Sequence, residues 1–373
     1  MVRKCICFIL VIISVFSILP GCVNNDFEVT NQGDPYVEFS AIDEEVSLVS
    51  IAVLDFYEGE KSAKEVYEQY SSKGSPYKQM AFSLNWGIYN IPLEVHIENM
   101  NFEIATDKDF KDAKNIVLVD SKRSVVLKDL YVDTTYFCRL NVLLSNEKSV
   151  IGETNFKTKA TPRILMADGA YGLRDIGGVK TSNGVKVKQG MVYRGSEIDG
   201  VKSERYTLSK EGVDFFVNDL KIATDFDFRG TTEKNAKNVL GETVNHKAYN
   251  IYAYSDSLTK DSRDGLKQCF SDLAEESNYP IYMHCSYGKD RTGTVVYLLQ
   301  ILLGVSEKDA YKEWELSALM DGVHFYDGME DFLEDLNKLE GNSMQEKVVN
   351  YLLSIGVTQD EIYSIRKIML DNW

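Results

Sequence analysis

The spacing of hydrophobic residues changes several times along the chain. An apolar run fills residues 5–19, and a polar stretch follows to about residue 34. From residue 81 to 158, apolar and polar residues alternate in short segments separated by turn residues, which is typical of an antiparallel β-sandwich. After residue 161, helical spacing alternates with short apolar strands. This second pattern predicts an α/β domain with a central, mostly parallel sheet flanked by helices.

Individual elements can be predicted within the N-terminal part. SLVSIAVLDF (47–56) is expected to be a strand, and EGEKSAKEVYEQYSSKGS (58–75) a short helix followed by a loop. Five further strands are expected at AFSLNW (81–86), NFEIATD (101–107), SVVLKDL (124–130), TYFCRLNVLL (135–144) and GETNFKT (152–158).

Residues 125–158 carry a resemblance to a known fold. VVLKDLYVDTTYFCRLNVLLSNEKSVIGETNFKT resembles the second half of a fibronectin type III domain, with Tyr136 in the place of its tyrosine corner. Trp86 would be the buried tryptophan of an early strand. The resemblance covers residues 76–160 and leaves 35–75 as an unassigned segment that contains β-structure.

The first residues have the layout of an export signal. Arg3 and Lys4 precede the apolar run, which ends in Leu-Pro-Gly-Cys at Cys22. This ending resembles the cleavage box of bacterial lipoproteins. It implies a signal peptide at 1–21, lipid attachment at Cys22 and a tether at 22–34. The protein is therefore expected in the cell envelope, held at a membrane by its N-terminal lipid.

The net charge and the cysteine count exclude several classes of function. A formal charge of −16 argues against general affinity for nucleic acid, which needs a basic face. Beyond Cys22 the chain carries Cys138, Cys269 and Cys285, an odd number without a CxxC pair. Neither a disulfide framework nor a zinc site is expected, so one of these cysteines is a candidate for a reactive thiol.

The segment HCSYGKDRTG (284–293) lies between a predicted buried strand and a predicted buried helix. Such a turn directs free backbone amides and the positive end of a helix dipole at one centre, which favours an anion. Gly288 lets the loop wrap closely around a ligand, and Arg291 can hold two phosphoryl oxygens. Cys285, near the helix N-terminus and a guanidinium, is expected to be a thiolate and a nucleophile.

The Cys-x5-Arg spacing suits in-line attack on phosphorus through a phosphocysteine intermediate. The Thr292 hydroxyl can ease departure of the sulfur in the second step, and His284 is expected to fix the loop by hydrogen bonds. The alternative for Cys285 is a small buried residue at the end of a strand. The number of functional residue types in one turn favours the catalytic interpretation.

These residues resemble the signature of the cysteine-based protein tyrosine phosphatase superfamily. The Lys-Asp-Arg tripeptide resembles a bacterial and fungal branch that acts on phosphotyrosine and, in some members, on phosphoinositides. The segment YGLRDIGGVKTSNGVKVKQGMVYRGSEI (171–198) resembles the opening motif of that branch, with RGSE in place of the commoner RSGE. DFDFRG matches its Asp-x-Arg strand at Asp227 and Arg229. The resemblance covers about residues 163–373 and implies a phosphatase domain there.

The resemblance also implies roles for individual residues. Asp290 would protonate the leaving group, with Asp256 in AYSDS as the alternative acid. Tyr287 stands where the branch usually has a small residue and would narrow the floor of the pocket. Lys289 would either add charge for a polyanionic substrate or lie solvated at the rim. The expected substrate-binding residues are Ser286, Tyr287, Gly288, Lys289 and Arg194.

The combined prediction is a multidomain protein with an N-terminal all-β, fibronectin type III-like sandwich and a C-terminal α/β phosphatase domain. Its expected activity is hydrolysis of phosphotyrosine-type phosphomonoesters by thiolate and guanidinium, without a metal or other cofactor. The alternatives are a phosphoinositide or inositol phosphate phosphatase of the same mechanism, and an inactive phosphatase-like lipoprotein that only binds its ligand. A third alternative is a rhodanese or an arsenate reductase, which also use a cysteine in an anion-binding loop. The segments GKDRTG and RDIGG favour a phosphatase over these two enzymes. The sandwich is a candidate surface for a protein partner.

Overall fold

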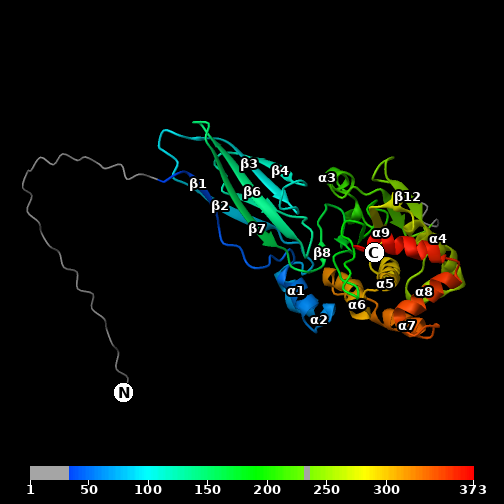
Figure 1. The fold of residues 1–373 in the computed structure, drawn as a ribbon. Coiled ribbons are helices and arrows are strands. Elements are labelled where there is room, and N and C mark those ends of the chain that lie inside the picture. The colour runs from blue at the N-terminus through cyan, green and yellow to red at the C-terminus, as the bar shows by residue number, and fades with distance from the viewer. Residues whose placement is uncertain (1–32, 231–235) are drawn as a thin grey trace, which may run out of the picture.

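The computed structural model describes residues 33–230 and 236–373. Two antiparallel sheets form the N-terminal part, and an α/β domain follows from Arg163 (Figure 1). The expected signal peptide, Cys22 and almost all of the expected tether lie outside the described residues. Every helix within the described ranges is too short or too polar to span a bilayer.

The strands of the N-terminal part form a three-stranded and a four-stranded sheet. The first has the order β1 (Tyr36–Phe39), β2 (Phe82–Tyr89) and β5 (Ser124–Leu127). The second has the order β4 (Lys114–Leu118), β3 (Ile97–Ala105), β6 (Thr135–Leu144) and β7 (Ser149–Lys157). The five strands expected from alternation all exist, and β1 extends this part to residue 36, well before the expected limit at 76.

Both sheets contribute to one hydrophobic core. Trp86 of β2 stacks on Phe102 of β3, with 6.1 Å between ring centroids. The Tyr136 ring stacks on Phe156, and its hydroxyl accepts a hydrogen bond from the backbone N–H of Tyr131 at 2.7 Å. The two aromatic residues singled out in the sequence therefore lie in this core.

The strand expected at residues 47–56 is wrong, because this segment begins the helix α1 (Ile51–Glu58). The Ser50 side chain accepts a hydrogen bond from Val53 N and caps the helix. Short apolar runs fit a strand and a buried helix equally well, and here tertiary packing decides. The expected helix that follows is confirmed as α2 (Ala63–Tyr70), which starts with a capping box between Ser62 and Glu65.

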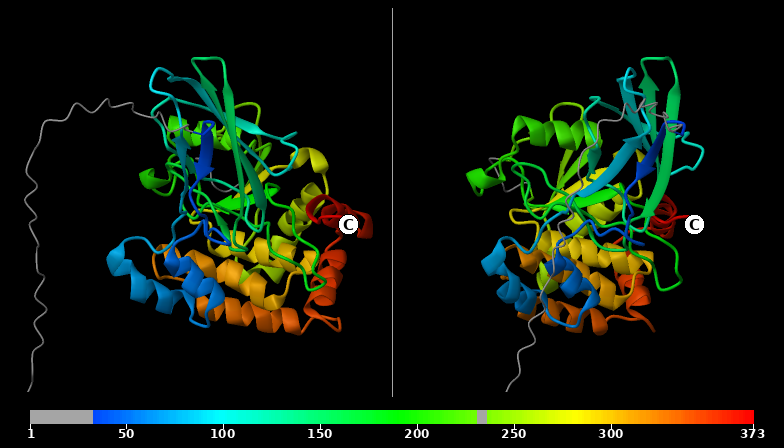
Figure 2. Two further views of the ribbon diagram at one scale, coloured as in Figure 1. Left: turned by 60° about the vertical axis from the view of Figure 1, so that its left-hand side comes forward. Right: turned by 90° about the vertical axis from the view of Figure 1, so that its left-hand side faces the viewer.

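The helices α1 and α2 pack against the C-terminal domain, beside its orange helices in both views of Figure 2. Their partners are α6 (Glu307–Glu315) and the following 3₁₀ turn η6 (Leu316–Met320). The ammonium group of Lys312 donates to three carbonyl oxygens at the C-terminal end of α1, at 2.8–3.1 Å. The Glu315 carboxylate accepts from Ala63 N at 2.9 Å. These contacts fix the helical pair on α6.

The α/β domain contains a six-stranded sheet. Its order is β12 (Asn245–Ala248), β11 (Thr224–Asp227), β13 (Ile281–His284), β10 (Val192–Gly195), β9 (Arg174–Asp175) and β8 (Arg163–Ile164). The first four strands run parallel, and β9 and β8 are antiparallel to their neighbours. The mostly parallel sheet expected from the sequence is confirmed.

Helices of this domain pack around the sheet. They are α3 (Lys210–Asp214), α4 (Lys260–Leu273), α5 (Asp290–Leu303), α6, α7 (Tyr326–Asn337), α8 (Met344–Ser354) and α9 (Gln359–Met369). The central helix α5 is buried throughout from Thr292 to Leu303, packed against α6, α8 and α9. Because β13 lies inside the sheet and leads directly into α5, the segment between them opens at the carboxyl edge of the sheet, where ligands bind in such folds.

Candidate active site

The loop between β13 and α5 wraps closely against the end of β10. Gly288 has φ of +69°, and a Cβ atom at this position would lie 2.0 Å from the carbonyl oxygen of Gly195. Only glycine fits both the left-handed backbone and this contact. The loop therefore packs directly against the end of β10, and α5 begins immediately after it at Asp290.

Cys285 is 3% exposed and differs in chemistry from the other thiols. Burial would raise its pKa, but the charge of Arg291 and the hydrogen bonds from the Thr292 side chain and backbone lower the pKa below its ordinary value. Burial raises the pKa of Cys138 to about 12, and it raises the pKa of Cys269 as well. Among the three buried thiols of the described chain, Cys285 is the one suited to be a thiolate.

Arg291 is held at one edge of the loop. Its Nη1 donates to the carbonyl oxygen of Phe228 at 3.2 Å, and its Nη2 donates to the Ser286 hydroxyl at 3.4 Å. A guanidinium carries five N–H donors, so these two contacts orient the group while leaving further donors for phosphoryl oxygens. The structure thus brings Cys285, Ser286, Arg291 and Thr292 together.

His284 lies beneath the loop at the end of β13 and is 1% exposed. Its Nε2 is 3.0 Å from the Asp225 carboxylate, and its Nδ1 is 3.3 Å from the carbonyl oxygen of Cys285. Burial would lower the pKa of His284, but Asp225 and Asp227 raise it to about 9. The imidazolium form donates from both nitrogens. It therefore ties the backbone of Cys285 to β11.

Asp290 starts α5 and accepts a hydrogen bond from the Tyr254 hydroxyl at 2.5 Å. It lies in the wall of a cleft of about 500 Å³, lined by Tyr252, Ala253, Tyr254, Asp290, Arg291, Phe325 and Gly328. Tyr252 and Phe325 are 54% and 63% exposed, so aromatic side chains form the outer part of this cleft. Asp290 and Arg291 therefore line the same cleft.

Asp256 belongs to the same 3₁₀ turn as Tyr254, η4 (Tyr254–Leu258), but its position is different. It is exposed and is absent from the lining of the cleft. Its carbonyl oxygen accepts hydrogen bonds from the backbone and side chain of Thr259 at the start of α4. The two candidate acids are thus not brought together.

Three of the expected substrate-binding side chains have other contacts. Lys289 is 8% exposed and donates to the Asp321 carboxylate and to the carbonyl oxygen of Val323 at 3.3 Å. Arg194 is 0% exposed and lies under the loop. Tyr287 is 42% exposed with its ring 6.1 Å from that of Tyr206. Tyr287 is thus exposed and absent from the lining of the cleft beside Asp290 and Arg291, and its effect on the pocket floor stays a prediction.

Asp227 at the end of β11 and Arg229 shortly after it belong to a buried ion cluster. Arg229 contacts the carboxylates of Glu197, Asp199 and Asp227 at 2.8–2.9 Å. Glu197 belongs to the RGSE segment, and its backbone N–H donates to the carbonyl oxygen of Ser286 at 3.3 Å. The cluster therefore joins β11, the segment after β10 and the loop between β13 and α5.

Sequence reasoning missed several residues around the site: Asp225, Tyr254, Glu313, Asp321 and Phe325. Asp225 lies within the quoted DFDFRG motif, so its place before Asp227 on a parallel strand was a usable signal. Tyr254, Asp321 and Phe325 lie 30 residues or more from the loop in sequence, and Glu313 is one of several acidic residues in α6. No local sequence pattern marks these four residues as part of the site.

Comparison with known proteins agrees with this geometry. A family model described as the tyrosine phosphatase family matches residues 165–371, more than half of the sequence. The C-terminal domain is thus a phosphatase domain, and the chain belongs to the tyrosine phosphatase family.

No curated protein sequence matches the chain. A solved structure similar to it is the core catalytic domain of the PP-IP phosphatase SIW14 from S. cerevisiae in complex with citrate. The two share 19% identity over 39% of this chain and 84% of that chain, with a TM-score of 0.28. This level of similarity carries no conclusion about substrate.

Proposed function

We propose that the chain hydrolyses phosphomonoesters through a phosphocysteine intermediate on Cys285. The observation that carries the proposal is a buried thiol whose pKa is lowered by Arg291 and Thr292 against the effect of burial. The thiolate attacks phosphorus, an S–P bond forms, and the P–O ester bond breaks. The leaving oxygen receives the electron pair and takes the proton of the Asp290 carboxyl group.

In the second step, water attacks the phosphorus of the intermediate and passes a proton to the Asp290 carboxylate. The S–P bond breaks, inorganic phosphate leaves, and the Cys285 thiolate is restored. Thr292 lowers the pKa of Cys285 and so stabilises the departing thiolate. Release of phosphate from an aryl phosphate by the purified chain tests the proposal. Ligand binding without turnover would instead favour the inactive binding protein.

We propose phosphotyrosine as the substrate class. The support is the aromatic wall of the cleft next to Arg291, formed by Tyr252, Tyr254 and Phe325, which suits an aryl leaving group. An inositol polyphosphate would require additional cations at the site. Lys289, the candidate for this role, is buried and already paired with Asp321.

The Lys289→Ala variant distinguishes the two substrate classes. Because the ammonium group is held by Asp321, kcat/KM should fall by factors that agree within about threefold on phosphotyrosine peptides and on inositol polyphosphates. Parallel steady-state assays measure both values. A loss confined to the polyphosphorylated substrates would show that Lys289 binds a second phosphate group. It would then favour inositol polyphosphates as the substrate class.

For the N-terminal part, we propose a fibronectin type III-like sandwich that presents a surface to a protein partner. The support is the pair of antiparallel sheets around one core and the contact between Tyr131 N and the Tyr136 hydroxyl. We further propose that the chain is a lipoprotein of the cell envelope, on the strength of the Leu-Pro-Gly-Cys ending at Cys22.

The Cys22→Ala variant tests the location. Without an acylated cysteine, the protein should move from the membrane fraction to the soluble fraction, because lipid would provide the anchor. Its specific activity should equal that of the unaltered chain. Fractionation that does not change on this substitution contradicts lipid attachment at Cys22.

A further inference from the structure

The carbonyl groups of the catalytic loop have a buried donor beneath them. Nη2 of Arg194, at the end of β10, donates to the carbonyl oxygen of Gly288 at 2.6 Å and to that of Lys289 at 3.3 Å. A loop that directs its amides at an anion must direct carbonyl groups elsewhere, and buried carbonyl groups need partners. Arg194 is 0% exposed and supplies these partners.

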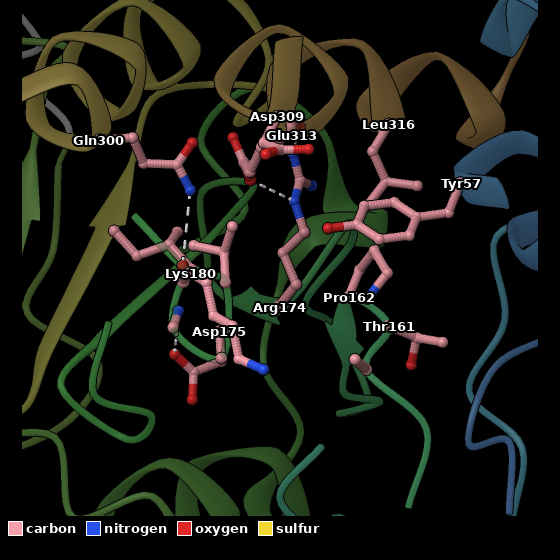
Figure 3. A pocket seen from close by; sticks show the side chains of 15 residues that line it. Tyr57, Thr161, Pro162, Arg174, Asp175, Lys180, Gln300, Asp309, Glu313 and Leu316 are labelled. Carbon is pink, nitrogen blue, oxygen red and sulfur yellow. Dashed lines mark hydrogen bonds and ion pairs between the residues drawn. The ribbon is translucent and has the colours of Figure 1, made fainter. Parts of the chain in front are cut away.

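One carboxylate holds this arginine in place. Oε2 of Glu313 in α6 accepts from Nη1 of Arg194 at 2.6 Å, and its Oε1 accepts from Nε of Arg174 at 2.7 Å. Arg174 also donates to the Glu313 carbonyl oxygen and to the Ser317 hydroxyl. Figure 3 shows Arg174 joined to Glu313 beneath α6. Glu313 thus bridges two buried guanidinium groups that would otherwise repel each other.

The charges of this group depend on one another. Burial and the neighbouring Arg174 lower the pKa of Arg194 to about 10, and Glu313 opposes this shift. Burial would raise the pKa of Glu313, but Arg174 and Arg194 lower it. Without the carboxylate, two like charges would remain buried side by side, which is costly.

We propose that Glu313 is a positioning residue of the catalytic loop, holding Arg194 so that Arg194 fixes the carbonyl groups of Gly288 and Lys289. Glu313 itself lies in α6, away from the cleft residues, and acts through Arg194. The proposal rests on the proposed function of Cys285. It predicts that loss of the carboxylate misplaces the loop, and misplacement of about 1 Å costs up to about 100-fold in rate.

The variant Glu313→Gln keeps the shape of the side chain and removes its charge. We expect kcat for an aryl phosphate to fall about 10- to 100-fold, and inhibition by orthovanadate, which occupies the same loop, to weaken by a similar factor. The matched control is Glu315→Gln. Glu315 is a buried carboxylate in the same helix that contacts Ala63 but not Arg194. Its loss should lower the unfolding temperature while leaving kcat and orthovanadate affinity near the unaltered values.

A double-mutant cycle separates positioning from general destabilisation. If Glu313 acts through Arg194, Glu313→Gln should have little further effect on kcat in an Arg194→Gln background. Additive effects of the two substitutions, or unchanged orthovanadate inhibition in Glu313→Gln, would overturn the positioning role. If Glu313→Gln does not fold, Glu313→Asp replaces it, with a smaller loss of both quantities expected. Failure of the unaltered chain to release phosphate would instead refute the proposed function.

Discussion

Replacing Cys285 with serine is expected to reduce turnover of aryl phosphates by a factor on the order of 10⁴ or more. A serine hydroxyl ionises far above neutral pH, so Arg291 and Thr292 cannot make it a nucleophile as they do the thiol. The loop and Arg291 remain in the variant. Orthovanadate should therefore still bind with an affinity within about tenfold of the unaltered chain. Steady-state kinetics and competitive inhibition measure the two quantities.

The other two buried cysteines are matched controls for this substitution. Cys138 and Cys269 are buried thiols whose pKa values are raised, and they belong to the cores of the N-terminal and C-terminal parts. Cys138→Ser and Cys269→Ser should lower stability while leaving kcat unchanged. Appreciable turnover by Cys285→Ser would refute covalent catalysis by this residue.

Replacing Asp290 with asparagine is the second large expected effect. Loss of the acid should slow hydrolysis of phenyl and alkyl phosphates by about 10²- to 10⁴-fold. Substrates with an acidic leaving group need little protonation, so for them the loss should shrink. The measurement is kcat/KM across a series of aryl phosphates that differ in leaving-group pKa.

Asp256→Asn is the matched control for the acid. Asp256 is exposed and outside the cleft that Asp290 and Arg291 line, so its substitution should leave the leaving-group dependence unchanged. If Asp290→Asn shows the same loss for every leaving group, its role is to fix the loop through Tyr254. A steep dependence in Asp256→Asn would then identify Asp256 as the acid.

Local sequence was sufficient to predict the surroundings of Cys285. The strand, the loop and the helix from Ile281 to Leu303 are continuous, so the position of Cys285 at a helix N-terminus follows from chain connectivity alone. The alternating strands of the N-terminal part were likewise readable, because one face of each packs on a shared core. Both successes depend on patterns within about 20 residues.

Contacts between distant segments account for what was missed. Residues 51–58 form a helix because their apolar face meets Leu316 and Leu319, more than 250 positions away. The burial of Arg194 at the end of β10 depends on its pairing with Glu313 of α6, more than 100 positions away. The charge of Lys289 is neutralised by Asp321. The residue types and spacing near the loop do not indicate these distant contact partners.

In the proposed mechanism, the phosphoryl group is transferred to Cys285 before water accepts it. The most direct test mixes the unaltered protein with an aryl phosphate, quenches the reaction in acid within one turnover, and examines the peptide containing Cys285 by mass spectrometry. Covalent catalysis predicts one phosphoryl group on the Cys285 sulfur, and none in Cys285→Ser. Turnover that continues at full rate without any phosphorylated Cys285 at early times would contradict it.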